Sequence, residues 1–277
     1  MKRTLEPAEL RDRVEQAAEA LREAGVLPPR VGWIASTGTA SLASELKGTT
    51  RLPLRRRPGF PSSFAEGSLL CGSLGGTAIA AVEGGPALHS GVSPLEVAFP
   101  VWILRALGAE VLLLTAAAGS LDPSLAPGEL LLVADHLNAS GLDPLRGLAD
   151  ERLGPRFPDL SSLYDGRLRA AARSAARKAR IPLREGIVAF RTGPSLETAA
   201  ERAWLRGSGA LGLVHSLVPE AIAAAHAGLR VLALAAATDA AHPEAGAVSI
   251  EAMAAASAAA EPRLGAVLSG ALAEAVP

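Results

Sequence analysis

Short apolar runs of strand length recur along this chain, and helical patterns separate several of them. A chain that alternates strands with helices forms a largely parallel sheet with helices on both faces. We therefore expect an α/β fold with a mixed, largely parallel central sheet flanked by helices. The apolar runs cover residues 31–35, 77–82, 111–115, 130–134, 187–190 and 231–237.

The composition is that of one soluble globular domain. Of the 277 residues, 49% are hydrophobic and 20% are charged, and the formal net charge is -1. These values exclude disordered and membrane-embedded chains. Because no abrupt change in composition marks a boundary, we interpret residues 1–277 as a single domain.

Lys and Arg do not gather into a basic surface. The densest run, Arg51 to Arg57, is short, flanked by proline and free of interleaved aromatic residues. We interpret it as a solvated loop, not as a nucleic-acid site. No apolar run approaches membrane-spanning length, and the segment after Met1 is charged and unlike a signal peptide. We expect neither nucleic acid nor membrane as a partner.

The single cysteine, Cys71, cannot form a disulfide within the chain. The sequence therefore carries no sign of adaptation to an oxidising compartment, and the cytoplasm is the expected location. Because Cys71 lies beside an apolar strand, we expect it to be a small core residue.

Helix signals complete the outline. A helix over residues 7–24 is expected, because its apolar residues fall on one face and Gly25 can end it. The predicted crossover helices are 94–107 and 195–206, the second begun by Pro194 and Ser195. The alanine-rich region after Ala235 keeps a helical pattern and is interpreted as a C-terminal helix. The one-sided apolar residues of the first helix are Leu10, Val14, Ala17, Ala18 and Leu21.

Two connections have features of functional loops. Residues 36–41 are small and follow the strand 31–35 directly, and backbone N–H groups at such a turn bind anions. Residues 135–165 are rich in Gly, Pro, Asp and Arg and are too long for a routine connection. This second segment is either functional or part of a subunit contact.

A series of short motifs extends over most of the chain, at residues 34–38, 99–101, 114–121, 135–138, 144–147, 150–152, 193–198, 218–220 and 237–239. In order and spacing they resemble the trimeric purine nucleoside phosphorylase and methylthioadenosine phosphorylase family. Such a set is specific for the fold and much less specific for activity. The resemblance implies a homotrimer in which a neighbouring subunit closes part of each pocket.

The resemblance implies reversible phosphorolysis of a purine nucleoside or of methylthioadenosine to free base and pentose 1-phosphate. Inorganic phosphate is the co-substrate, and no other cofactor is implied. Phosphate attacks the anomeric carbon through a cationic, oxocarbenium-like state. The departing purine needs its negative charge neutralised at N7.

The resemblance gives roles to two carboxylates. Asp239 matches the residue that meets N7, and if it is buried it can donate a proton or a hydrogen bond to the departing base. As an alternative, Asp239 caps a turn after its strand. Glu197 matches a carboxylate that accepts hydrogen bonds from the purine edge, or else it interacts with the dipole of a helix N-terminus. Position 239 resembles the 6-aminopurine branch and position 197 the 6-oxopurine branch, so base preference stays open.

Hydroxyl and backbone groups match the rest of the substrate site. For phosphate the matches are Thr37 with Gly38, the backbone N–H of Ala117, and Ser216, which also lies near the sugar. Such groups can bind an anion, but they supply no full positive charge. Thr37 is otherwise a helix cap and Ser216 a turn hydroxyl. Further matches to the nucleoside pocket are Thr238, His89 and His215, of which His89 replaces an aromatic residue over the sugar and His215 replaces a Met. As an alternative, each of these two histidines is a structural residue with its hydrogen bonds satisfied within the fold.

The sequence departs from the family where phosphate is bound. The family's phosphate-binding Arg and His align with Gly85 and Ala87, and a further family His is missing from residues 64–68. The chain therefore lacks the bidentate Arg contact that holds an anion strongly.

Two other functions stay open because of these losses. One is a nucleoside-binding protein without catalysis, and the other is a nucleoside hydrolase with Glu66 or His89 as candidate base. No metal-ligand cluster and no dinucleotide fingerprint are present in the sequence, so neither a metal nor a nicotinamide cofactor is predicted.

Overall fold

The computed structural model describes residues 5–36, 46–240 and 249–276 of the chain. Thr37 and Gly38, both expected at the phosphate, lie outside the described residues. The helices are α1 (Leu10–Glu23), α2 (Pro94–Leu107), α3 (Gly166–Ala179), α4 (Ala199–Gly207), α5 (Val218–His226) and α6 (Ile250–Ala275). The strands are β1 (Val31–Ala35), β2 (Lys47–Pro53), β3 (Ser68–Leu74), β4 (Thr77–Glu83), β5 (Val111–Ser120), β6 (Leu130–Asn138), β7 (Leu183–Phe190), β8 (Ala210–Val214) and β9 (Arg230–Ala237).

The strands form one nine-stranded sheet that closes on itself at one end. Its order is β2-β3-β4-β1-β5-β8-β7-β6-β9, and β5 also pairs with β9. The last five strands therefore form a ring, while β1, β4, β3 and β2 extend from it. β1 is parallel to β4 and β5, whereas β5 is parallel to β9 and antiparallel to β8. The mixed α/β sheet expected from the sequence is confirmed.

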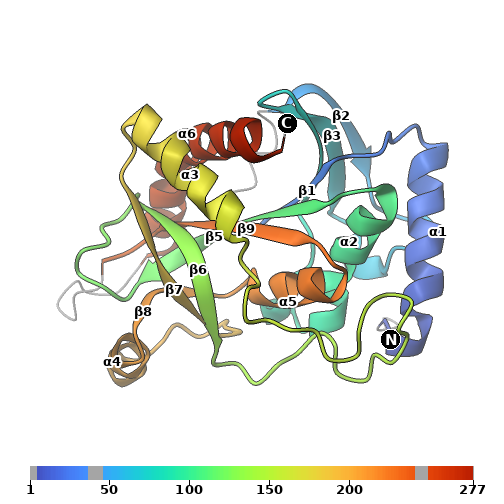
Figure 1. The fold of residues 1–277 in the computed structure, drawn as a ribbon. Coiled ribbons are helices and arrows are strands. Elements are labelled where there is room, and N and C mark those ends of the chain that lie inside the picture. The colour runs from blue at the N-terminus through green and yellow to red at the C-terminus, as the bar shows by residue number, and fades with distance from the viewer. Residues whose placement is uncertain (1–4, 37–45, 241–248, 277) are drawn as a thin grey trace.

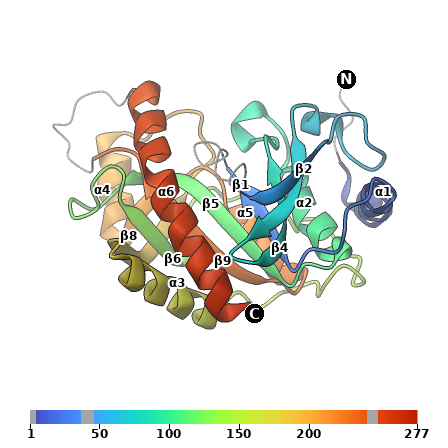
Figure 2. The same ribbon diagram turned by 90° about the horizontal axis from the view of Figure 1, so that it is seen from above.

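Helices cover the sheet on two sides (Figures 1 and 2). On one side α3 packs against α6, and on the other α2 packs against both α1 and α5. Each side has its own apolar cluster, and β5 and β9 contribute buried residues to both. The side chains of these two central strands are therefore buried on both faces, which explains their continuous apolar sequences. None of the helices in the described ranges is long and apolar enough to cross a membrane.

Two helices form as their sequences predict. The buried face of α1 consists of the five apolar residues expected there, and Gly25 follows with a left-handed φ of 87°. In α2, the hydroxyl of Ser93 accepts a hydrogen bond from the Glu96 N–H at 3.2 Å, and Pro94 occupies the first turn. The predicted span of α2, residues 94–107, is confirmed.

The predicted start of the second crossover helix is wrong. Helix α4 begins at Ala199, not at Ser195, because Thr198 and Glu201 form a capping box. The Thr198 hydroxyl accepts from the Glu201 N–H at 3.2 Å, and the Glu201 carboxylate accepts from the Thr198 N–H at 2.9 Å. Residues 193–198, which include a cis peptide bond before Pro194, are instead part of the loop between β7 and α4.

Some elements give no clear apolar pattern and are missed. Strand β2 is exposed along nearly its whole length, so Arg51 belongs to an edge strand rather than to the expected solvated loop. Its neighbour Cys71, on β3, is only partly buried. The long loop expected over residues 135–165 is shorter, because β6 continues to Asn138 and Tyr164 forms an isolated bridge with Val231.

Candidate active site

One cavity of about 540 Å³ opens at an edge of the sheet. It lies where β1, β4, β5 and β9 end, and because these neighbours are parallel their carboxyl ends share one edge. Glu66, the candidate base of a hydrolase, is not part of its lining, but all of the site residues that the family resemblance implies within the described ranges are. They are His89, Ala117, Glu197, His215, Ser216, Thr238 and Asp239.

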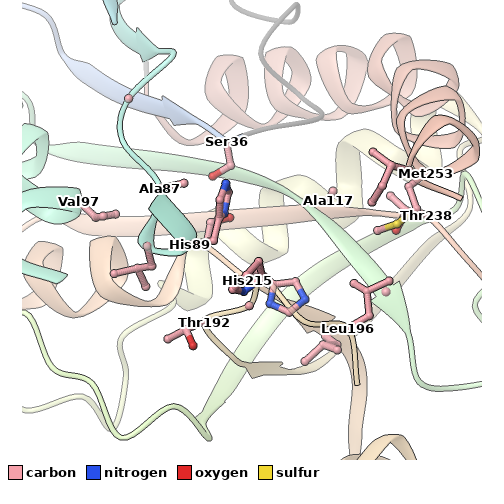
Figure 3. Close-up of a pocket in the computed structure, with 18 of the residues that line it drawn as sticks. Ser36, Ala87, His89, Val97, Ala117, Thr192, Leu196, His215, Thr238 and Met253 are labelled. Atoms are coloured by element: carbon pink, nitrogen blue, oxygen red, sulfur yellow. The ribbon is translucent and has the colours of Figure 1, made fainter. Parts of the chain in front are cut away.

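The cavity has two sides in Figure 3. Ser36, Ala87 and His89 gather on one side, and Thr238 and Met253 lie on the other. A volume of this size is typical of a small-molecule site. The side with Ser36 and residues 84–89 is called the β4 side. The side with Thr238, Asp239 and the residues in contact with them is called the β9 side.

Glu197 has a buried carboxylate with no close partner. Its side chain is only 2% exposed, and Oε2 makes no hydrogen bond to the described residues. The nearest cationic groups are Arg191 Nε, 3.9 Å from Oε1, and His215 Nε2, 3.9 Å from Oε2. Both distances are too long for hydrogen bonds. A buried acceptor left in this state is suited to a ligand N–H donor.

His215 is held by the backbone. Its Nδ1 lies 3.0 Å from the carbonyl oxygen of Arg191, and a carbonyl can only accept, so Nδ1 carries the proton. Nε2 is left facing Glu197. The next residue, Ser216, precedes the N-terminus of α5 and lines the same cavity.

Asp239 follows β9 and is buried, with a relative exposure of 8%. Its Oδ1 accepts a hydrogen bond from the Ser120 N–H at 2.6 Å, and its Oδ2 lies 3.1 Å from Nη2 of Arg202. One carboxylate oxygen therefore faces a backbone N–H and the other faces a guanidinium, and both of these groups are donors. The contacts in the structure thus favour Asp239 as an acceptor rather than as the proton donor that burial alone suggests.

Thr238 directly follows β9, and Ala117 lies on β5, which pairs with β9 in parallel. The Thr238 hydroxyl donates to the Ala118 carbonyl oxygen at 3.1 Å, and its N–H donates to the same oxygen at 2.9 Å. Its hydroxyl proton is therefore already used within the sheet. Ala117 is partly exposed to the cavity, as a backbone donor to a ligand must be.

The β4 side is poor in charge. Residues 84–88 contribute small or apolar side chains, and His89, in a short 3-10 turn, is exposed. Within the described lining of the cavity, the only Arg or Lys is Arg202. Gly85 and Ala87 stand where the family motif has an Arg and a His. No lysine or arginine in the described lining of the β4 side takes their place. No group of side chains in the described residues could hold a metal ion.

Sequence reasoning missed two charged residues of the cavity, Arg202 and Glu220. Burial raises the pKa of Glu220 to about 7, and backbone hydrogen bonds from Glu220 and Leu217 oppose the shift. Oε2 of Glu220 has no hydrogen-bond partner among the described residues. Glu220 was recognisable only as part of a motif, and nothing in the local sequence of Arg202 indicates that it meets Asp239.

Comparison with known sequences places the chain in a family. Residues 30–273 match the family model described as the phosphorylase superfamily. Over 237 residues the chain is 39% identical to purine nucleoside phosphorylase 1 of Bacillus subtilis, covering 84% of this chain and 87% of that protein. Over 233 residues it is 36% identical to purine nucleoside phosphorylase of Rattus norvegicus, covering 81% of each.

A solved structure shows the same fold. Isoform 2 of purine nucleoside phosphorylase from Schistosoma mansoni, in complex with cytosine and ribose-1-phosphate, has a TM-score of 0.90 to this chain. The two are 30% identical, and the match covers 96% of this chain and 97% of the other. The resemblance drawn from the sequence motifs is confirmed.

Proposed function

The chain belongs to the phosphorylase superfamily, and from that premise we propose that it catalyses phosphorolysis of a purine nucleoside or of methylthioadenosine. The products are the free base and a pentose 1-phosphate. The observation that carries this proposal is the convergence of Glu197, Asp239 and Ser216 on one cavity. The high identity to proteins named purine nucleoside phosphorylase, over most of the chain, supports it.

Glu197 and Asp239 serve the purine. The buried Oε2 of Glu197, which has no hydrogen-bond partner among the described residues, accepts a hydrogen bond from a ring N–H, which also relieves the cost of its burial. Asp239 belongs to the group that meets the five-membered ring of the base. His215 lies beside Glu197 and fixes its side of the pocket through the Arg191 carbonyl.

Ser216, Ala117, Thr37 and Gly38 serve phosphate, which is the co-substrate, and no further cofactor takes part. Ser36 supports this assignment, because it lies at the end of β1 on the β4 side of the cavity. Phosphate there meets hydroxyl and N–H donors in place of a guanidinium, which makes its binding weaker. His89 and Thr238 line the pocket around the sugar and the base.

The proposed enzyme is a homotrimer in the cytoplasm. Large apolar side chains that are exposed support an association surface, among them Leu196 and Ile250 at the cavity and Trp204 on α4. Phe157, in the long connection after β6, is 86% exposed. Cys71 is a free thiol, which suits a reducing compartment.

Release of base from inosine, guanosine, adenosine and methylthioadenosine, measured with and without phosphate, tests the proposal. We expect release that depends on phosphate and that falls about 10³-fold in Asp239→Ala. Release without phosphate would identify a hydrolase. Absence of release together with purine binding would leave a nucleoside-binding protein and overturn the phosphorylase.

A further inference from the structure

Arg202 and Asp239 form an ion pair inside the cavity. Arg202 lies in the first turns of α4, its side chain is 24% exposed, and its Nη2 is 3.1 Å from Asp239 Oδ2. The same Nη2 donates to the Ser120 carbonyl oxygen at 2.5 Å, and the Ser120 N–H donates to Asp239 Oδ1 at 2.6 Å. Both backbone groups of Ser120 therefore fix the pair, one to each partner.

This anchoring leaves Asp239 as an acceptor. Both of its oxygens already face donors, so the carboxylate presents acceptors, and not a donor, to a leaving purine. Arg202 retains donors that can neutralise the charge of the purine. In the part of the chain that the structure describes, its Nη1 and Nε have no hydrogen-bond partner, since its side-chain contacts run through Nη2.

Gly119 leaves this pair open to the cavity. A Cβ at position 119 would lie 3.4 Å from Asp239 Oδ1 and 3.7 Å from Arg202 Nη1. A larger side chain there would cover the groups that face the cavity. Gly119 and Arg202 both line the cavity, together with Asp239.

We propose that Arg202, held in place by Asp239 and Ser120, is the group that stabilises the departing purine. This inference rests on the proposed function and adds a catalytic residue to it. The bond between the anomeric carbon and purine N9 breaks, and its electron pair stays on the base. A bond forms between the anomeric carbon and an oxygen of hydrogenphosphate. The proton of hydrogenphosphate passes through solvent to the released base.

The guanidinium acts on the charge that develops on the base. The pair Arg202–Asp239 is neutral overall, but the N–H donors of Arg202 strengthen as negative charge grows at N7 and at the six-position substituent. A donor fixed before the reaction contributes more than one that must reorganise.

The test compares two leaving groups. Hypoxanthine leaves inosine as an anion, whereas the N7-methylated ring of 7-methylinosine already carries a positive charge and leaves as a neutral base. The variants are Arg202→Met, which removes the charged guanidinium but keeps an unbranched apolar stem, and Arg202→Lys, which keeps the charge. Arg206→Met is the matched control, because Arg206 is exposed and lies on the same helix outside the cavity lining.

We expect Arg202→Met to lower kcat/KM for inosine about 10²-fold and for 7-methylinosine less than about threefold. Arg202→Lys keeps part of the activity on inosine, and Arg206→Met stays within about twofold of wild type on both substrates. The KM for phosphate is unchanged in Arg202→Met. Circular dichroism and thermal melting show whether each variant is folded.

Equal losses on the two substrates would overturn the proposal, because Arg202 would then only shape the pocket. So would unchanged activity, or a higher KM for phosphate with unchanged kcat, which would make Arg202 an anion clamp. If wild type does not cleave inosine with phosphate, the proposed function fails separately. Calorimetry with hypoxanthine then decides the contact: weaker binding to folded Arg202→Met supports it, and equal binding refutes it.

Discussion

The two sides of the cavity differ in how they present charge. On the β9 side, Asp239 is fixed by an ion pair with Arg202. Elsewhere in the same cavity, beside His215, the buried Oε2 of Glu197 is available to a ligand donor. On the β4 side, residues 84–88 are small or apolar, and the one titratable neighbour, His89, is exposed. The comparison teaches that the residues proposed for the base are charged and held by defined contacts, whereas those proposed for the anion are hydroxyl and N–H donors.

The largest effect is expected at Glu197, which we propose to bind the base. Glu197→Gln replaces one acceptor oxygen by a donor, which opposes the ring N–H of the purine, so kcat/KM for inosine should fall about 10³-fold. Steady-state hypoxanthine release measures it, with the exposed surface residue Glu110→Gln as a control for loss of one carboxylate. A loss confined to the KM for phosphate would mean that the two sides have been assigned the wrong way round.

How much of this site the sequence predicts depends on whether a residue acts alone or through a partner. Glu197 lies in the motif at residues 193–198, Ser216 shortly precedes the motif at residues 218–220, and both line the cavity. Helix α1 and the apolar strands can be predicted from hydrophobic periodicity. Burial of one face of a helix, or of both faces of a strand, produces a recognisable pattern of apolar residues in the local sequence. The ion pair of Asp239 with Arg202 produces no such pattern in the sequence, because it depends on how α4 packs beside Ser120. The predicted start of α4 at Ser195 was wrong, because the capping box at Thr198 starts the helix at Ala199.

Glu220 differs from Asp239 in the same cavity. Asp239 is paired with Arg202, whereas Oε2 of Glu220 has no hydrogen-bond partner among the described residues. The pKa of Glu220 is raised to about 7 from 4.5, so the folded protein keeps a proton that the unfolded chain loses above pH 4.5. Its contribution to stability is present below that pH and is lost as pH rises through 7. The loss amounts to about 3 kcal/mol, since one pKa unit corresponds to roughly 1.36 kcal/mol.

Urea denaturation of wild type and Glu220→Gln between pH 5 and 8 checks this expectation. Taking the difference between the two proteins isolates Glu220 from His226, whose pKa is lowered by burial and whose effect therefore has the opposite sign. The free energy of unfolding should fall more steeply with pH in wild type. Parallel curves would show that Glu220 is ionised in the folded protein throughout this range.

Restoring a cation on the β4 side should strengthen phosphate binding and so reduce the difference between the two sides. A side chain at Gly85 has room, because among the described residues its Cβ would lie within 4 Å of Phe64 Cε1 alone, at 3.6 Å, and its backbone is not left-handed. Gly85→Arg should lower the KM for phosphate about tenfold, since a hydrogen bond to a charged group contributes about 1.5–3 kcal/mol. Gly166→Arg, at an open position at the start of α3, is the control for added charge. An unchanged KM for phosphate would place the anion elsewhere.

The smallest effect is expected at His89. An exposed imidazole is screened by solvent and adds little to anion binding, so His89→Ala should change the KM for phosphate by less than about threefold at pH 7. Initial rates at varied phosphate and saturating nucleoside measure it. A tenfold rise would show that His89 replaces the missing cation, and the β4 side would then no longer be neutral.

The central claim is that this cavity transfers the pentose to phosphate despite its neutral anion side. The most direct measurement is ³¹P NMR of the enzyme with inosine and inorganic phosphate, alongside quantification of hypoxanthine. The account predicts that a sugar 1-phosphate resonance grows in equal amount with hypoxanthine, and that neither forms in Asp239→Ala at the wild-type rate. Hypoxanthine released with free ribose and no phosphate ester would contradict it.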